Sequence, residues 1–281
     1  MLLREVEYAR PSSVDDALRL LGSHEGARPL AGGQTLVNVM KARVAAPDVL
    51  VDLNGLDELR WIRFGDDQRL EVGAMVTYSQ LMASSEIEVA RPILAEVCAT
   101  IADVQVRNRG TIGGNVCSND PTNHLPPLMV ALDARMTIAG GDGERTVPAE
   151  EFFLGVYMTA VGPGELLTRI TVPRSAGGDG FAAVTIGRDG TCIVNAAASL
   201  DGSSPRVAIG CVDAVPVRAR ELEQRLSGSD GLDERAVRDA AQGLGGSLQP
   251  PSDVHASADY RRHLAEVLAA RAVLQAAERG R

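Results

Sequence analysis

Residues 106–117 read Val106-Arg107-Asn108-Arg109-Gly110-Thr111-Ile112-Gly113-Gly114-Asn115-Val116-Cys117. The paired glycines in this stretch allow a backbone to approach a ligand closely and to point successive amide N–H groups at it. The hydroxyl of Thr111 and the amide of Asn115 flank the pair and add hydrogen-bonding groups. A helix-like apolar run follows at residues 128–132. The segment is therefore a candidate anion-binding turn.

A second glycine turn lies earlier in the chain and reads Ala31-Gly32-Gly33-Gln34-Thr35-Leu36. It also carries polar neighbours and opens onto an apolar-periodic stretch that reaches Met40. A pyrophosphate group is best bound by backbone amides and helix N-termini, which such turns supply. Tight turns use glycine without binding anything, so the residues alone leave a purely structural role open.

Two common nucleotide-binding signatures are missing from the sequence. No run fits G-x-G-x-x-G, and no Gly-Lys-Ser/Thr follows either turn. A nucleotide bound by these turns would therefore lie outside the Rossmann and P-loop frameworks.

Composition excludes several other functions. The net charge of -9 argues against a nucleic-acid partner. The four cysteines show no CxxC spacing and the four histidines are dispersed, so we predict no metal site and no iron–sulfur cluster within the chain. No paired carboxylates or Ser/His/Asp arrangement marks a catalytic residue. The first residues become charged too early for a signal peptide, and no apolar run approaches a membrane span, which predicts a cytoplasmic protein.

Hydrophobic periodicity predicts an α+β chain. We expect a capped helix from Ser13 that ends at Gly22, a buried strand at 49–53, and a hairpin of 61–64 with 69–72. Further predicted elements are a helix at 93–101, a strand at 165–172, a domain boundary at 175–180, three strands at 181–186, 192–200 and 206–212, and helices at 219–226, 233–244 and 258–278.

These motifs together resemble the FAD-binding subunits of molybdenum hydroxylases. The likeness covers the two glycine turns and the segment Pro47-Asp48-Val49-Leu50-Val51-Asp52-Leu53 between them. It continues through Gly164-Glu165-Leu166-Leu167-Thr168 and Ala258-Asp259-Tyr260-Arg261-Arg262. It is strongest to the medium subunits of aerobic carbon monoxide dehydrogenases, and the flavin domain of xanthine dehydrogenase is similar.

The resemblance implies a PCMH/VAO-type FAD-binding domain at 1–174, with subdomains of about 1–57 and 58–174. A C-terminal domain at 178–281 would hold a three-stranded antiparallel sheet with helices. The resemblance also implies that both turns hold the pyrophosphate and its surroundings, that Asp120 lies on the loop after the second turn, and that Leu167 lies near the flavin ring. The implied cofactor-binding residues are Ala31, Gly32, Gly33, Gln34, Thr35, Thr111, Gly113, Gly114, Asn115, Asp120 and Leu167.

By the same resemblance, non-covalent FAD receives electrons from a molybdenum cofactor in a large subunit, through 2Fe-2S clusters in a small subunit. An external acceptor then takes the electrons. The chain departs from the family at His124, where an Asp is usual, and in segment 182–191, whose side chains would cover the ring. Two alternatives remain, a stand-alone flavin oxidoreductase and a flavin-free scaffold of the same fold.

Overall fold

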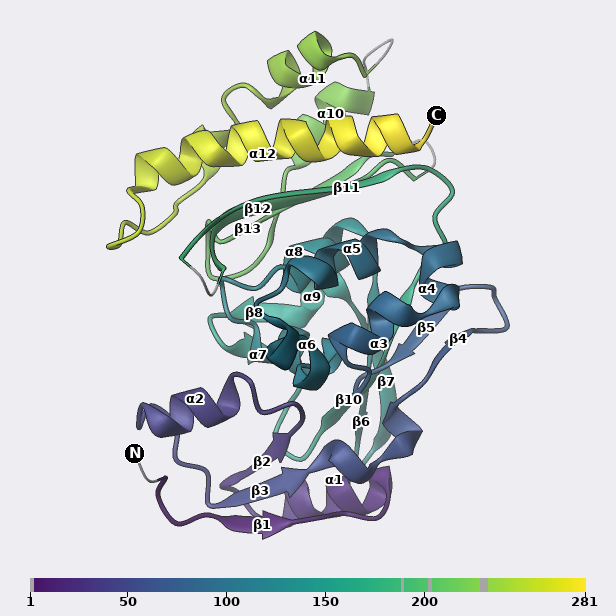
Figure 1. Ribbon diagram of the computed structural model, residues 1–281, viewed down its shortest axis with the longest axis vertical. Helices are drawn as coiled ribbons and strands as arrows, with labels where there is room; N and C mark the ends of the chain where they lie inside the picture. The colour runs from purple at the N-terminus through teal and green to yellow at the C-terminus, as the bar shows by residue number, and fades with distance from the viewer. Residues whose placement is uncertain (1–2, 188–189, 202–203, 228–231) are drawn as a thin grey trace.

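The computed structural model describes residues 3–187, 190–201, 204–227 and 232–281. Its elements form three regions that follow one another along the long axis of the molecule, from the purple N-terminal region to the yellow C-terminal helix (Figure 1). Each region has its own cluster of buried apolar side chains.

The first region is a small parallel sheet with two helices. Its strand order is β1-β3-β2, and the central strand β3 is buried throughout, as expected for the apolar run Val49-Leu50-Val51. The helix α1 begins after Ser13, whose Oγ accepts a hydrogen bond from Asp16 N at 3.1 Å. It ends at Ser23, one residue beyond the predicted end at Gly22. The elements are β1 (Glu7–Ala9), α1 (Val14–Ser23), β2 (Ala27–Leu30), α2 (Leu36–Lys41), β3 (Val49–Asp52) and two 3-10 turns, η1 (Leu53–Gly55) and η2 (Asp57–Leu59).

The second region is a five-stranded antiparallel sheet covered by short helices. The strand order is β4-β5-β10-β6-β7, so β10, from late in the sequence, lies between strands from the region's start and middle. The helices and the β8–β9 hairpin bury the largest apolar cluster of the chain. The strands are β4 (Ile62–Phe64), β5 (Leu70–Gly73), β6 (Arg135–Gly140), β7 (Gly143–Pro148), β8 (Phe153–Gly155), β9 (Met158–Thr159) and β10 (Leu166–Val172); the helices are α3 (Tyr78–Ala83), α4 (Ser85–Ala90), α5 (Ile93–Thr100), α6 (Val104–Arg109), α7 (Ile112–Ser118), α8 (Leu125–Ala131) and α9 (Ala149–Phe152).

The third region is an antiparallel sheet with one face under a long helix. The three expected strands are β11, β12 and β13, and the two-residue β14 adds a fourth at the edge. The helix α12 covers one face and α8 contacts the other (Figure 1). A Cβ at Gly180 would lie 1.9 Å from the carbonyl oxygen of Ala272, so this glycine lets β11 approach α12 closely. The elements are β11 (Asp179–Ile186), β12 (Thr191–Ser199), β13 (Arg206–Gly210), β14 (Val217–Arg218), α10 (Arg220–Ser227), α11 (Glu234–Ala241), η3 (Leu244–Ser247) and α12 (Ala258–Arg279).

A buried arginine joins the second region to the third. Arg91, directly after α4, is 1% exposed, and its Nε lies 2.9 Å from Oδ2 of Asp179. Its Nη1 lies 2.7 Å from Oδ2 of Asp201, and its Nη2 donates a hydrogen bond to Oγ of Ser199 at 2.9 Å. These contacts link positions more than 85 residues apart. A buried guanidinium is costly unless it is paired, which explains why two carboxylates lie beside it.

Half-buried ion pairs reinforce the same junction. Glu150 of α9 forms ion pairs with both Arg218 and Arg220, and Asp133 lies 2.8 Å from Arg206. The second and third regions are thus joined by charges that are paired within the chain.

No helix within the described ranges is both long and apolar enough to cross a bilayer.

Candidate cofactor-binding site

The first glycine turn connects β2 to α2 and is held by its own backbone and amide groups. Gly33 has a φ of +72°, a conformation that residues with a Cβ rarely adopt. The side chain of Gln34 donates from Nε2 to the carbonyl oxygen of Gly32 at 2.9 Å. Thr35 precedes α2, and its hydroxyl makes no capping hydrogen bond.

The two glycine turns, far apart in sequence, contact each other directly. A Cβ at Gly32 would lie 2.1 Å from the carbonyl oxygen of Arg109 and 2.9 Å from Cα of Gly110. A Cβ at Gly114 would lie 3.5 Å from Cβ of Ala31. Any side chain at position 32 would therefore separate the turns, so this glycine is required by the contact and not only by a local bend.

The second turn begins α7 and is fixed from within. Oγ1 of Thr111 accepts a hydrogen bond from Gly114 N at 3.0 Å, and a Cβ at Gly113 would lie 2.6 Å from the carbonyl oxygen of Ala74. Nδ2 of Asn115 donates to the hydroxyl of Tyr78 at 2.9 Å. Burial raises the pKa of Tyr78, which keeps that hydroxyl protonated. The side chain of Asn115 thus points into the protein interior.

A groove of about 320 Å³ opens beside the contact between the turns. Four of the predicted residues, 31–34, line it, whereas Thr35, the predicted residues of segment 111–115, Asp120 and Leu167 do not. None of the described residues that line it is acidic. They are Leu30, Ala31, Gly32, Gly33, Gln34, Val37, Asn38, Lys41 and Arg109.

Two cations of this groove escaped the sequence analysis. Lys41 is the last residue of α2, and Arg109 is the last residue of α6. Lys41 could have been singled out from the sequence, because it is the only lysine in it. For Arg109 no signal existed, because two other residues of its segment, Arg107 and Asn108, are polar as well.

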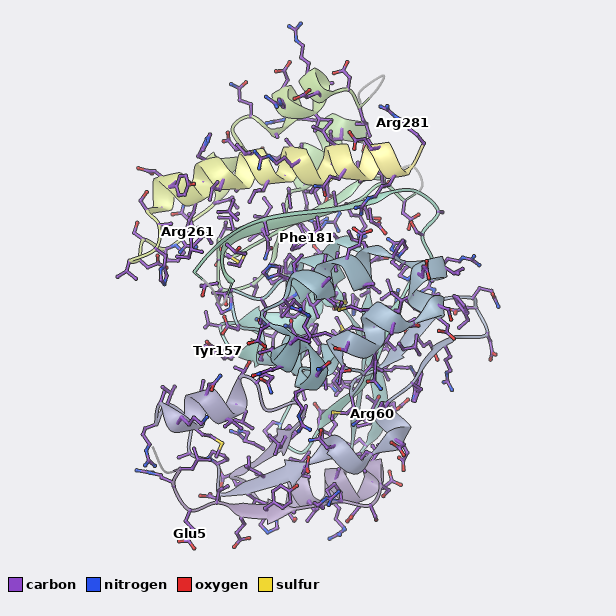
Figure 2. All side chains as sticks on the ribbon, viewed as in Figure 1. Glu5, Arg60, Tyr157, Phe181, Arg261 and Arg281 are labelled. Atoms are coloured by element: carbon purple, nitrogen blue, oxygen red, sulfur yellow. The ribbon has the colours of Figure 1, made fainter. Side chains whose placement is uncertain are left out.

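The remaining predicted residues lie elsewhere. Oδ2 of Asp120 accepts a hydrogen bond from the hydroxyl of Tyr157 at 2.9 Å, and Oδ1 of Asp120 accepts one from Thr122 N. Tyr157 extends from the β8–β9 hairpin on the side that faces the first region (Figure 2). Partial burial and the neighbouring carboxylate of Asp120 raise the pKa of Tyr157 to about 12. Leu167 is 4% exposed within the core of the second region.

His124, the departure from the family pattern, is buried at the junction of the second and third regions. Its ring centroid lies 5.4 Å from that of Phe181 in β11. Burial lowers the pKa of His124 to about 4, so the imidazole is neutral near pH 7. The other departure, segment 182–191, is described except for Arg188 and Asp189, which lie outside the described residues.

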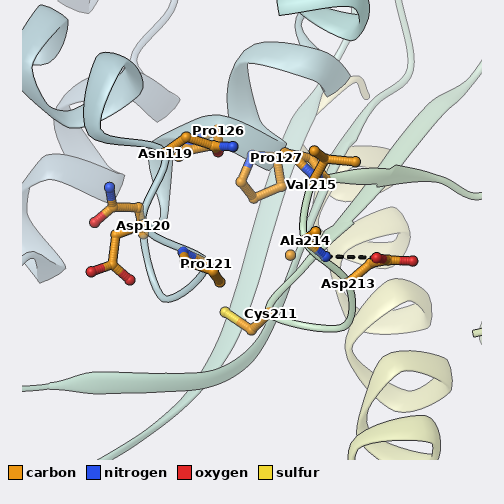
Figure 3. A pocket seen from close by; sticks show the side chains of 12 residues that line it. Asn119, Asp120, Pro121, Pro126, Pro127, Cys211, Asp213, Ala214 and Val215 are labelled. Carbon is orange, nitrogen blue, oxygen red and sulfur yellow. Dashed lines mark hydrogen bonds between the residues drawn. The ribbon is translucent and has the colours of Figure 1, made fainter. Parts of the chain in front are cut away.

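A small cavity lies next to the segment that carries His124. Its volume is about 10 Å³, and it lies between residues 119–127 and the segment 210–216, where Ala214 N donates a hydrogen bond to Oδ1 of Asp213 (Figure 3). This is close to the volume of a single water molecule. Among the described residues, no cluster of three or more His, Cys, Asp or Glu side chains is placed to hold a metal ion.

The groove suits the diphosphate of a dinucleotide. The glycine turn that lines it packs closely against the backbone of Arg109, and its charged side chains are basic although the whole chain carries a net charge of -9. Backbone amides and cations are the groups that stabilise a diphosphate.

Comparison with known proteins identifies the cofactor class. Residues 4–175 match the FAD-binding domain of molybdopterin dehydrogenases, and residues 181–276 match the C-terminal domain of carbon monoxide dehydrogenase flavoproteins. The protein is thus an FAD-binding flavoprotein of the oxidoreductase class.

Full-length relatives define the family. The carbon monoxide dehydrogenase medium chain of Afipia carboxidovorans is 37% identical, and the match covers 100% of both chains. The glyceraldehyde dehydrogenase medium chain of Sulfolobus acidocaldarius is 34% identical over 97% of this chain and 99% of that one. A solved chain of reconstituted carbon monoxide dehydrogenase from Oligotropha carboxidovorans, 36% identical, superposes with a TM-score of 0.93 over 99% of this chain and 100% of its own. This chain belongs to the family of FAD-binding medium subunits of molybdenum hydroxylases.

Proposed function

We propose that the chain binds FAD non-covalently and carries electrons within a larger molybdenum hydroxylase. The electrons would come from 2Fe-2S clusters of a small partner subunit, supplied by a molybdenum cofactor in a large partner subunit, and would leave to an external acceptor. The observation that carries the proposal is the direct packing of Gly32 on Arg109 beside a basic groove, in a chain of this family. FAD supplies the redox chemistry when bound, and the protein supplies placement and electrostatics.

The residues proposed to hold the cofactor are those of the two turns. Segment 31–35 would present backbone amides to the diphosphate, and segment 111–115 would support that turn from behind. Asp120 and Leu167 would act further along the cofactor, toward the flavin ring. This assignment rests on the resemblance, with the contact between the turns as its support.

The domain division and location are proposals of the same kind. We place the FAD-binding domain at 1–174, with subdomains of about 1–57 and 58–174, and the C-terminal domain at 178–281. The two family matches, which meet between residues 175 and 181, support this division. We also propose a cytoplasmic location, where the four free cysteines would stay reduced.

A visible absorption spectrum of the purified chain tests the proposal. We expect the absorption bands of oxidised flavin. After denaturation and ultrafiltration, the flavin should appear in the filtrate, as expected for non-covalent FAD. A folded, colourless protein that takes up no added FAD would contradict the proposal and favour a scaffold role. Reduction of the bound flavin by a small substrate, with the isolated chain alone, would favour a stand-alone oxidoreductase.

A further inference from the structure

Asn54 lies in the 3-10 turn η1, and its side-chain amide contacts the first glycine turn. Its Nδ2 donates hydrogen bonds to the carbonyl oxygen of Ala31 at 2.9 Å and to Oδ1 of Asp52 at 2.6 Å. Both partners are acceptors, so only the NH2 group of the amide can satisfy them, which fixes the orientation of the amide. Asn54 itself is not one of the residues that line the groove.

The buried carboxylate of Asp52 anchors Asn54. Its Oδ1 also accepts a hydrogen bond from Asn54 N at 3.0 Å, and its Oδ2 accepts one from the hydroxyl of Tyr8 in β1. Burial disfavours the charge of Asp52, but hydrogen bonds from Tyr8 and Asn54 outweigh burial and lower the pKa of this carboxyl. Nη2 of Arg60 donates to the carbonyl oxygen of Asn54 at 3.0 Å. Asn54 is therefore held through both its backbone and its side chain.

The hydrogen bond to Ala31 fixes the peptide group between Ala31 and Gly32. In a trans peptide the C=O and the N–H point in opposite directions, so the N–H of Gly32 points away from Asn54. Within the described residues, this N–H has no hydrogen-bond acceptor. Ala31 and Gly32 line the groove whereas Asn54 does not, so the N–H of Gly32 is free to donate to a ligand there.

The same peptide could adopt the reverse orientation. Gly32 has no Cβ and Gly33 has a φ of +72°, so the backbone of this turn has more rotational freedom than a chain of other residues. A reversed peptide would point the carbonyl oxygen of Ala31 at the groove. That oxygen repels an anion, whereas an N–H attracts it. A group outside the turn is needed to prevent the reversal.

Resting on the proposed function, we infer that Asn54 is a positioning residue of the first glycine turn, which keeps the N–H of Gly32 directed toward the groove. Asp52 holds Asn54 in place for this role. Neither side chain would touch the cofactor. Both would act on the affinity for FAD and would have no part in electron transfer.

Titration of the full-length chain, freed of cofactor, with FAD tests this inference. We expect Asn54→Ala to weaken FAD binding by about tenfold, the value of one lost hydrogen bond. Asp52→Ala should weaken it in the same direction. Ser247→Ala removes a hydrogen bond from Oγ to the carbonyl oxygen of Leu244 in the third region. This control should bind FAD like the unmodified chain, and urea denaturation shows that each variant is folded.

An NMR signal of the peptide itself separates positioning from general stabilisation. Carbonyl-¹³C alanine with ¹⁵N glycine selects the amides of the three Ala-Gly pairs, 31–32, 139–140 and 176–177. Saturating FAD should move the proton signal of Gly32 downfield, because its N–H donates to the ligand. In Asn54→Ala, also at saturation, we expect a smaller movement. The other two pairs are internal controls.

The outcomes separate this inference from the proposed function. If the unmodified chain takes up no FAD, the proposed function is contradicted, and this inference with it. If the unmodified chain and Asn54→Ala bind FAD equally tightly, only the positioning role is contradicted. If Asn54→Ala binds FAD less tightly but keeps the full movement of the Gly32 signal at saturation, Asn54 only stabilises the turn, which also overturns the inference.

Discussion

The two contacts between regions of this molecule are built in opposite ways. The second and third regions meet through charges that pair with each other within the chain, with Arg91 buried between Asp179 and Asp201. The first and second regions meet at Gly32, where a missing side chain brings two turns together and two cations are left without a partner in the described chain. A permanent junction can bury its charges, whereas a contact that receives a ligand must keep its donors available.

The largest expected effect is at the permanent junction. Substitution Arg91→Met leaves the buried carboxylate of Asp179 without its cation, and burial already raises the pKa of that carboxyl. We expect the free energy of unfolding to fall by about 3–5 kcal/mol in urea denaturation. Arg19→Met, which breaks an exposed pair with Asp16, should cost at most about 1 kcal/mol. Equal losses in the two variants would contradict a special role for the buried arginine.

The junction should also weaken in acid because of His124. Its pKa is about 4 in the folded protein and near its ordinary 6.5 in the unfolded chain, so only the unfolded chain gains a proton between these values. Stability present above about pH 6.5 is therefore lost as the pH falls toward 4. At about 1.4 kcal/mol per pKa unit, the total is about 3 kcal/mol.

Comparison of urea denaturation at pH 7 and pH 4 measures this loss. The variant His124→Asn should lose less stability over this range than the unmodified chain does. The same comparison in His24→Asn, which removes an exposed imidazole in the first region, is the control. An unchanged slope in His124→Asn would show that the buried imidazole is not the acid-sensitive group.

The contact between Gly32 and the backbone of Arg109 should be disrupted by the addition of a single methyl group at position 32. Gly32→Ala would place a Cβ 2.1 Å from the carbonyl oxygen of Arg109, so the turns must separate. We expect a loss of about 1–3 kcal/mol in stability and weaker FAD binding. At Gly22, within α1, a Cβ meets nothing within 4 Å, and Gly22→Ala should stabilise by up to about 1 kcal/mol. Unfolding curves and FAD titrations of both variants distinguish a contact effect from a general effect of alanine.

The smallest effect is expected at the rim of the permanent junction. Glu150→Gln removes ion pairs to Arg218 and Arg220, but Arg218 keeps its pair with Glu223 at 2.6 Å. We expect a loss below about 1 kcal/mol that shrinks further in high salt. A loss as large as that of Arg91→Met would mean that the rim, rather than the buried arginine, holds the junction.

Local sequence patterns predicted many elements of the fold, but not the strands β1, β2 and β6–β9 or the short helices α3, α4, α6, α7 and α9. Ser13 caps α1 as expected, because this signal depends only on neighbouring residues. The predicted end of α1 was wrong by one residue, because a glycine alone does not always end a helix. The short edge strand β14 was missed because a two-residue strand has no periodicity.

The site was predicted only in part. The glycine turns stood out by composition, and the resemblance assigned them to a cofactor. The orientation of their side chains is set by tertiary packing. Asn115 therefore contacts Tyr78 in the interior and does not line the groove. The contact between Gly32 and Arg109 joins residues 77 positions apart, which no local pattern can report.

The sequence by itself determined the α+β class and the two turns, because glycine conformation and hydrophobic period are local properties of the chain. The order of its motifs also supplied the resemblance to the family. The tertiary structure alone decided which polar groups meet. It buried Arg91 and His124 at one junction and left Lys41 and Arg109 facing a common groove. The reason is physical, since burial and charge pairing depend on how distant segments pack.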